Sequence, residues 1–241
     1  MAENPTLVPG SEIVTESIEI SSDGFDLKVY QAKPTVPGPF PAVIVIHENR
    51  GLVSYLRDVA NGLASSGYFA VAPDLLSREG GTYSFQDINK EIPEKLQTIQ
   101  SERHTTDVQT VINYLNARDD IGRIGIIGFC FGGAVVWNLI IEAKDIAAAV
   151  PFYGTNPPLA GVPNIHTAVF AVYGDLDERV NAGLPAIKEA LEAAGIEHHI
   201  SVYPSSLHGF LNHRNPERYN PASAHEAWSD ALAWLDQHLR S

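Results

Sequence analysis

Cysteine is nearly absent from this chain, since Cys130 is the only one among 241 residues. A single cysteine excludes an internal disulfide framework and a zinc site built from several thiolates, and it suits a reducing compartment. The nine histidines include no pair with the HxxxH or HEXXH spacing of a metal-binding helix. We therefore expect no metal site, and the lone thiol is left as a residue to explain.

Positive charge is also scarce. Sixteen Lys and Arg residues face 29 Asp and Glu residues, which gives a formal net charge of −13. Binding to nucleic acid depends on clustered Lys and Arg that neutralise phosphates, and the chain contains no such run. We expect no nucleic-acid partner.

Long uninterrupted apolar runs are missing as well. The longest, 124–141, contains four glycines and Asn138, so it is better explained as two buried elements joined by a turn than as a membrane span. The first residues, 1–6, are polar and acidic, without the positive start and apolar stretch of a signal peptide. The sequence therefore predicts a cytoplasmic protein with no membrane segment.

The chain has no repeat, linker or low-complexity tract, and its length fits one domain over residues 1–241. Segments typical of strands alternate with segments typical of helices, which predicts an α/β fold with a mostly parallel, doubly wound sheet covered by helices on both faces. We expect strands at 42–47, 68–72, 124–129, 147–153, 168–173 and 199–203, and helices at 55–66, 106–117, 131–143, 184–194 and 222–239.

Two further regions complete this prediction. The runs 12–21 and 27–32 are joined by a turn sequence and predict an antiparallel hairpin at the sheet edge. Residues 75–100 lack strong periodicity, and 78–82 within them is expected to form an exposed excursion that edges a pocket.

The junction between the predicted strand 124–129 and the following helix reads Gly128-Phe-Cys130-Phe-Gly132-Gly133. This Gly-x-Cys-x-Gly pattern is that of a nucleophile elbow with cysteine in the usual serine position. The sharp turn strains the nucleophile's backbone and leaves no room for side chains two residues away. The helix start directs N–H groups at the sulfur, which favours a thiolate and an oxyanion. The alternative is a buried structural cysteine.

A thiol nucleophile needs a base, and the base needs an orienting acid. After the predicted strand 168–173 come two candidate acids, Asp175 and Asp177, and after the last strand comes His208. These positions follow the carboxyl ends of strands, where parallel α/β sheets place their sites. Read alone, His208 could equally be an exposed loop histidine.

Charged residues directly follow the first central strand, in the sequence His47-Glu48-Asn49-Arg50-Gly51. In a doubly wound sheet this loop lies beside the elbow, so the backbone N–H groups of Asn49 and Phe131 are the expected oxyanion hole. Glu48 would then face Cys130. The alternative is a surface ion pair between Glu48 and Arg50.

Together these segments resemble the dienelactone hydrolase family of α/β-hydrolases from about residue 12 to the C-terminus. The resemblance rests on six motifs, namely Val43–Gly51, Ala72-Pro-Asp74, Gly125–Gly133, Val150–Gly154, Gly174-Asp-Leu-Asp177 and His208-Gly-Phe210. It implies an α/β-hydrolase fold and a Cys-Asp-His triad made of Cys130, Asp177 and His208, with Asp177 preferred over Asp175. It also implies that Glu48 lies beside the thiol and keeps it protonated until substrate displaces the carboxylate.

One position departs from the family. Its members hold the substrate's carboxylate with arginines, one of them four residues after the catalytic histidine, and that position here is Asn212. We expect Arg50 and Arg103 to bind substrate instead, with Arg78 and Arg214 as further candidates. Dienelactone itself is therefore not the expected substrate.

The sequence thus predicts a hydrolase that cleaves a lactone or small carboxylic ester through a covalent thioester, without a cofactor. A thioesterase or broad carboxylesterase with the same triad is the alternative among enzymes, and a catalytically idle binding domain is the alternative outside them. The expected partner is a small-molecule ester or lactone, and the expected assembly is a monomer or small homo-oligomer.

Overall fold

A computed structural model describes residues 12–22 and 24–240 of the chain. The N-terminal residues that argued against a signal peptide lie outside this described part. No helix within it is long and apolar enough to cross a membrane.

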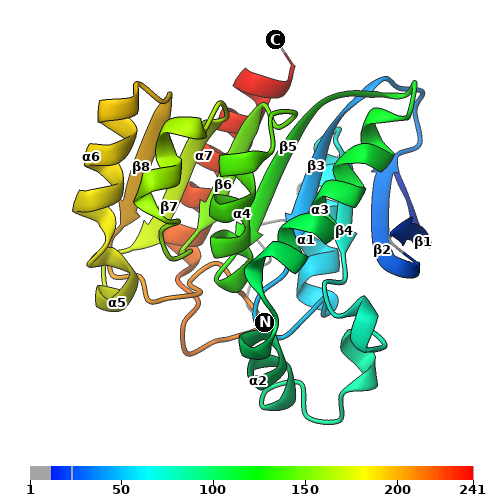
Figure 1. The fold of residues 1–241 in the computed structure, drawn as a ribbon, viewed down its shortest axis with the longest axis horizontal. Helices are drawn as coiled ribbons and strands as arrows, with labels where there is room; N and C mark the ends of the chain where they lie inside the picture. Colours follow the sequence, from blue (N-terminus) through cyan, green and yellow to red (C-terminus); the bar gives the residue numbers. More distant parts are fainter. Residues whose placement is uncertain (1–11, 23, 241) are drawn as a thin grey trace.

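Eight strands form one sheet in the order β1-β2-β4-β3-β5-β6-β7-β8 (Figure 1). β1 pairs antiparallel with β2, and β2 with β4, whereas all pairs from β4 to β8 are parallel. The expected parallel sheet with an antiparallel edge hairpin is confirmed. The strands are β1 (Ile13–Ser22), β2 (Phe25–Pro34), β3 (Phe40–Ile46), β4 (Phe69–Pro73), β5 (Ile121–Phe129), β6 (Ala148–Phe152), β7 (Ala168–Gly174) and β8 (His198–Tyr203).

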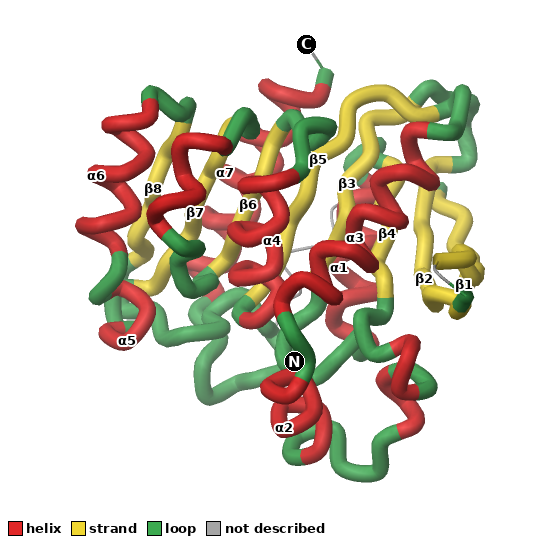
Figure 2. The backbone as a smooth tube through the Cα atoms, viewed as in Figure 1, coloured by secondary structure: helices red, strands yellow, loops and turns green. Residues whose placement is uncertain are grey.

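Helices cover both faces of this sheet and make three layers (Figure 2). α1 and α7 pack on one face, and α3, α4 and α6 pack on the other. The helices are α1 (Ser54–Ser65), α2 (Glu91–Thr98), α3 (Ser101–Asn116), α4 (Phe131–Glu142), α5 (Glu178–Asn181), α6 (Leu184–Ala194) and α7 (Pro221–Leu239). Short 3₁₀ turns occur at Ser77–Glu79, Thr82–Ser84 and Leu159–Asn164.

The central strand β3 shows why its sequence is continuously apolar. Successive side chains of a strand point to opposite faces. Val43 and Val45 accordingly enter the core under α1 and α7, and Ile44 and Ile46 enter the core under α3 and α4. Both faces are buried, so neither can carry polar residues.

The region 75–100 contains more structure than its periodicity predicts. Leu75 joins the main core, but the other buried apolar side chains of this region do not. Leu76, Ile92 and Leu96 instead form a small separate cluster, against which Phe131 packs. Regular helical spacing is not needed for such a local cluster, so the sequence pattern gave no clear indication of α2.

The expectation of an exposed excursion at 78–82 is wrong for its second half. Thr82 is fully buried and is hydrogen-bonded to the buried carboxylate of Asp74. Arg78 forms an ion pair with Asp107 of α3.

α3 starts at Ser101, earlier than its apolar periodicity suggests. Its first turn carries Arg103 and His104, which contact Glu79 and Phe131.

Candidate active site

Cys130 lies at the sharp turn between β5 and α4. Its φ is 55°, in the left-handed region that side chains other than glycine seldom adopt. A Cβ on Gly132 would stand 2.5 Å from the carbonyl oxygen of Ile46, and a Cβ on Gly128 would collide with the carbonyl of Gly132. The strained backbone at Cys130 and the steric need for both glycines, expected from the sequence, are confirmed.

The thiol is kept protonated by its surroundings. Burial raises the pKa of Cys130 to about 11, and the nearby Glu48 carboxylate adds to this effect. The backbone N–H of Phe131, at the start of α4, opposes the rise by donating to the sulfur. An isolated thiolate is therefore disfavoured at this position.

The candidate base, His208, and the candidate acids meet beyond the carboxyl ends of β7 and β8. His208 Nδ1 lies 2.5 Å from Asp177 Oδ2, and the Asp177 side chain is buried. Asp175 has a different contact, because its Oδ1 accepts a hydrogen bond of 2.9 Å from the Ser206 backbone N–H. Of the two candidate acids, Asp177 thus contacts the histidine, and Asp175 anchors the loop that carries it.

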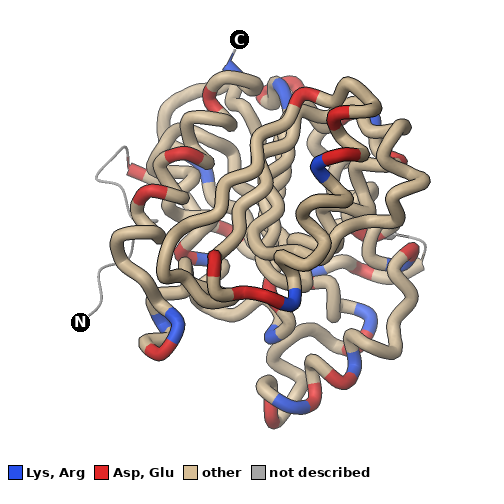
Figure 3. The backbone as a smooth tube through the Cα atoms, turned by 90° about the vertical axis from the view of Figure 1, so that its left-hand side faces the viewer, with Lys and Arg blue, Asp and Glu red and all other residues tan. Residues whose placement is uncertain are grey.

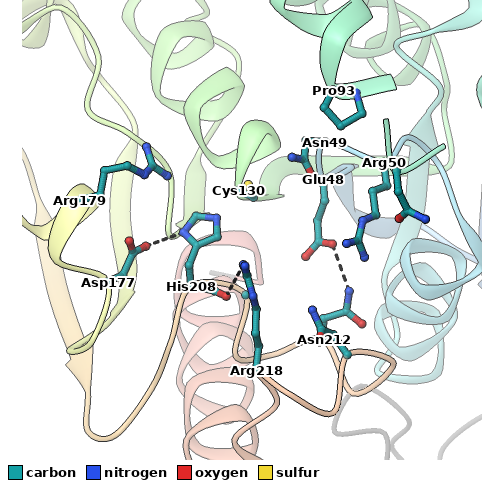
Figure 4. A pocket seen from close by; sticks show the side chains of 13 residues that line it. Glu48, Asn49, Arg50, Pro93, Cys130, Asp177, Arg179, His208, Asn212 and Arg218 are labelled. Carbon is teal, nitrogen blue, oxygen red and sulfur yellow. Dashed lines mark hydrogen bonds and ion pairs between the residues drawn. The ribbon is translucent and has the colours of Figure 1, made fainter. Parts of the chain in front are cut away.

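The histidine loop is also held from its far end. Asn220, the N-cap of α7, donates from Nδ2 to the Ser205 carbonyl and the Ser206 hydroxyl, both at 3.1 Å. The ring of Tyr153, which follows β6, lies 5.0 Å from the His208 ring between centroids. These contacts restrict the imidazole to a narrow range of positions beside Cys130 (Figure 4).

Glu48 is buried at the end of β3, with 8% of its surface exposed. Its Oε2 accepts a hydrogen bond of 3.1 Å from Asn212 Nδ2. Burial raises its pKa to about 7, against the smaller lowering effects of Asn212 and Arg50. In the described part of the chain it forms no ion pair with Arg50, so the surface-pair alternative does not describe this loop.

A hollow of about 410 Å³ surrounds these groups. The side chains of Glu48, Cys130, Asp177 and His208 all line it, and so does Asn49, whose N–H is an expected oxyanion donor. Figure 4 shows His208 between Asp177 and Cys130, with Glu48 on the other side of the thiol.

The arginines divide into two groups. Arg50 lines the hollow, as expected from the sequence, together with Arg179 and Arg218. Arg103 does not line it, because both of its terminal nitrogens bond to the Glu79 carboxylate. The further candidates are similarly engaged, Arg78 with Asp107 and Arg214 with Asp58.

Sequence reasoning missed Arg179 and Arg218, and also the wall formed by Asn89, Pro93 and Asn215. The position of Arg179 in the sequence could have indicated it, because it follows the candidate acid Asp177 by two residues. Arg218 lies ten residues beyond His208 and reaches back to its carbonyl oxygen at 3.3 Å, which no local pattern indicates. Within 12–22 and 24–240, no cluster of three His, Cys, Asp or Glu side chains could hold a metal ion.

Comparison with known proteins identifies a family for this chain. The model of the dienelactone hydrolase family matches residues 27–239. A Salmonella typhimurium protein, provisionally named a carboxymethylenebutenolidase, is 30% identical over 97% of this chain and 92% of its own length.

Two solved structures are similar. A protein from Klebsiella pneumoniae, provisionally called a dienelactone hydrolase, has a TM-score of 0.86 at 29% identity and covers 94% of this chain and 100% of its own. A dienelactone hydrolase-like promiscuous phosphotriesterase from metagenomic libraries has a TM-score of 0.83 at 19% identity, with 94% and 98% covered, which shows the shared fold. With a family match over residues 27–239 and a relative 30% identical over nearly the whole chain, the chain belongs to the dienelactone hydrolase family of carboxylic ester hydrolases.

Proposed function

We propose that the protein hydrolyses a lactone or small carboxylic ester through a covalent thioester on Cys130. The observation that carries the proposal is the 2.5 Å contact between His208 Nδ1 and Asp177, in a hollow that also contains the thiol. It leaves the imidazole's Nε2 as the nitrogen available to Cys130, which is the arrangement of a nucleophile, base and orienting acid.

In the proposed acylation step, the thiol proton passes to His208 Nε2 and Sγ attacks the carbonyl carbon. The carbonyl oxygen becomes an oxyanion, which the backbone N–H groups of Phe131 and Asn49 stabilise. Collapse of this intermediate breaks the carbon–oxygen bond. The alkoxide takes the proton from His208, and in a lactone it stays attached to the acyl group.

Glu48 is proposed to assist at the start of this step. Because burial raises its pKa to about 7, the carboxylate can accept the thiol proton near neutral pH when substrate enters the hollow and pass that same proton on to His208. In the free enzyme the same carboxylate disfavours thiolate formation, which protects Cys130 from oxidation.

In the proposed deacylation step, water replaces the thiol as the nucleophile. A water molecule loses a proton to His208, attacks the thioester carbonyl and displaces Sγ, which regains the proton from His208. Asp177 stabilises the imidazolium formed in each half of the cycle.

The decisive experiment compares the wild-type protein with Cys130→Ala. We expect the variant to lose at least about a thousandfold in kcat/KM on every ester that the wild-type protein cleaves. Intact mass spectrometry of the wild-type protein with a slowly hydrolysed ester should show one acyl adduct, absent from the variant. A variant that keeps full activity would refute the mechanism.

The same assays separate the alternatives. A panel of lactones, p-nitrophenyl esters and acyl thioesters distinguishes a lactonase or esterase from a thioesterase by relative kcat/KM. An idle binding domain would cleave none of them. It would also show no link between turnover and protection of Cys130 from iodoacetamide.

A further inference from the structure

Cys130 lies where two hollows of different character meet. The first is the polar hollow of about 410 Å³ described above. The second, of about 430 Å³, extends under α2. Both are lined by the thiol and by His208, and they share the following further residues: Asn49, Pro93 and Arg179. A substrate bound over the thiol therefore has access to two separate spaces.

The first hollow is hydrophilic beyond the shared residues. Its walls there are formed by the following residues: Glu48, Arg50, Asn89, Asp177, Gly209, Asn212, Asn215 and Arg218. Both carboxylates among them already have partners, Asn212 and His208. Arg50 and Arg179 form no ion pair with described residues, so their guanidinium groups are available to an anionic ligand. Free amides can pair with hydroxyl groups, which both donate and accept.

The second hollow is mostly apolar beyond the shared residues. Leu96 of α2 faces Phe131 and Ala134 of α4 across it, and Tyr153 closes one side. Leu96 and Tyr153 are buried. Its remaining wall, Gln97 and Thr155, is exposed. Such a space favours an apolar group and offers no cation other than the shared Arg179.

The catalytic groups decide which part of an ester enters which hollow. The leaving oxygen must lie near His208, whose loop supplies Gly209, Asn212, Asn215 and Arg218 to the polar hollow. The acyl carbonyl must lie near the Phe131 N–H at the start of α4, and the side chains of Phe131 and Ala134 line the apolar hollow.

Resting on the proposed hydrolase function, we propose that the substrate is an open-chain ester of an apolar acid with a hydrophilic, anionic alcohol. The acyl group occupies the apolar hollow under α2, and the alcohol, with its carboxylate or phosphate, occupies the polar hollow beside Arg50 and Arg218. A compact lactone fills only one of these spaces, so it uses less of the available binding surface.

A pair of isomeric esters tests this orientation. O-butanoylglycolate has an apolar acyl group and an anionic alcohol, and monopropyl malonate has the same atoms with the ester reversed. We expect kcat/KM, divided by the alkaline hydrolysis rate of each ester, to be about tenfold or more higher for O-butanoylglycolate. Its neutral methyl ester should be cleaved about tenfold less efficiently than the anion.

Two variants test which part of the substrate occupies each hollow. Ala134→Leu narrows the apolar hollow, so the kcat/KM ratio of O-butanoylglycolate to O-acetylglycolate should fall about tenfold. Ala193→Leu, at an exposed position of α6, is the matched control and should keep the ratio. Arg50→Gln should reduce the preference for O-butanoylglycolate over its methyl ester.

The outcomes separate this inference from the function on which it rests. If Cys130-dependent hydrolysis occurs but monopropyl malonate is preferred, or the two isomers are equal, the orientation is wrong and the hydrolase stands. An unchanged ratio in Ala134→Leu overturns the acyl assignment. If no ester is cleaved in a Cys130-dependent way, both proposals fail.

Discussion

Glu48 and Cys130 lie in surroundings that disfavour the charged form of each. Burial is the larger cause for both, raising the pKa of the carboxyl to about 7 and that of the thiol to about 11. Each negative charge also opposes the other. The site therefore holds at most one of the two charges at neutral pH, which suits an enzyme that forms its thiolate only when substrate is bound.

Glu48→Gln should make the thiol more acidic. The substitution removes the carboxylate's charge but not the effect of burial, so the pKa of Cys130 falls part of the way towards its ordinary value of 9.0. The rate of iodoacetamide alkylation at pH 8 should rise several-fold. Glu189→Gln, on the exposed surface of α6, is the control. An unchanged pH profile of alkylation would count against coupling between these two groups.

The same variant should alter the dependence of stability on pH. The pKa of a glutamate is ordinarily 4.5, and that of Glu48 is about 7 in the folded protein. Between these values the unfolded chain has lost the proton and the folded protein has kept it, so stability falls as pH rises through this window. Glu48→Gln removes this loss. At pH 8 the free energy of unfolding of the variant should therefore exceed that of the wild-type protein by about 2–3 kcal/mol. Urea unfolding at pH 4.5 and pH 8 measures the difference, which should vanish at the lower pH.

At the scale of elements, the site is assembled from strand ends. Three non-glycine residues in the described chain have positive φ, and they follow three different strands: Cys130 after β5, Tyr153 after β6 and Ser205 after β8. Strain of this kind persists only where surrounding packing holds it. Cys130 carries the thiol, the Tyr153 ring lies against the His208 ring, and Ser205 lies three residues before His208 in the same loop, so the packed sheet holds the candidate site in place.

The loop after β3 is fixed by the region 75–100. The Leu52 backbone N–H donates to Thr82 Oγ1 at 2.7 Å, and the Thr82 hydroxyl donates to the buried Asp74 carboxylate at 2.9 Å. Leu52 lies three residues beyond Asn49, whose N–H is a proposed oxyanion donor. The segment 78–82 is thus placed to position one half of the proposed oxyanion hole.

Thr82→Val keeps the size of the side chain and removes this link. A buried N–H left without its acceptor costs about 1–3 kcal/mol of stability. We expect kcat to fall about tenfold with little change in KM, because the loss acts on the oxyanion rather than on bound substrate. Thr82→Ser retains the hydroxyl and should restore most of kcat. Equal losses in both variants would indicate a packing effect instead.

At the scale of the whole molecule, the charge of the site differs from that of its surroundings. The chain carries a net charge of −13, and acidic residues are spread over many elements with basic ones among them (Figure 3). Three arginines nevertheless gather around one hollow. The local field attracts an anionic substrate, and the field of the whole protein repels it.

Ionic strength distinguishes these two fields. The Debye length is about 10 Å at 0.1 M salt, so both fields are screened by added salt. If the local arginines dominate, kcat/KM for O-butanoylglycolate should fall between low salt and about 0.3 M salt, and that for its methyl ester should stay constant. A rise in kcat/KM for the anion would show that the net negative charge dominates. Stopped-flow or pH-stat assays at constant pH measure both.

Much of this arrangement was accessible from the sequence because its causes are local. Alternation of strand and helix patterns predicted the sheet, since it reflects uniform burial. The glycines around Cys130 predicted the elbow, since they stand together in one short motif even though Gly132 packs against the distant Ile46 carbonyl. The region 75–100 was inaccessible for the opposite reason. Its cluster is irregular, and its buried Asp74–Thr82 link joins residues whose spacing follows no period.

The sequence by itself determined the α/β architecture, the glycine-flanked turn with its single thiol, and the order of Cys130, the two candidate acids and His208 along the chain. Only the tertiary structure decided that Asp177 rather than Asp175 contacts His208, and that Glu48 is buried against Asn212. It also decided that Arg179 and Arg218, not Arg103, line the hollow. The physical reason is the separation along the chain over which each pattern acts, since turn motifs and periodic patterns each lie within a short stretch of sequence. The lining of a site depends instead on how loops from distant strands converge once the sheet has packed.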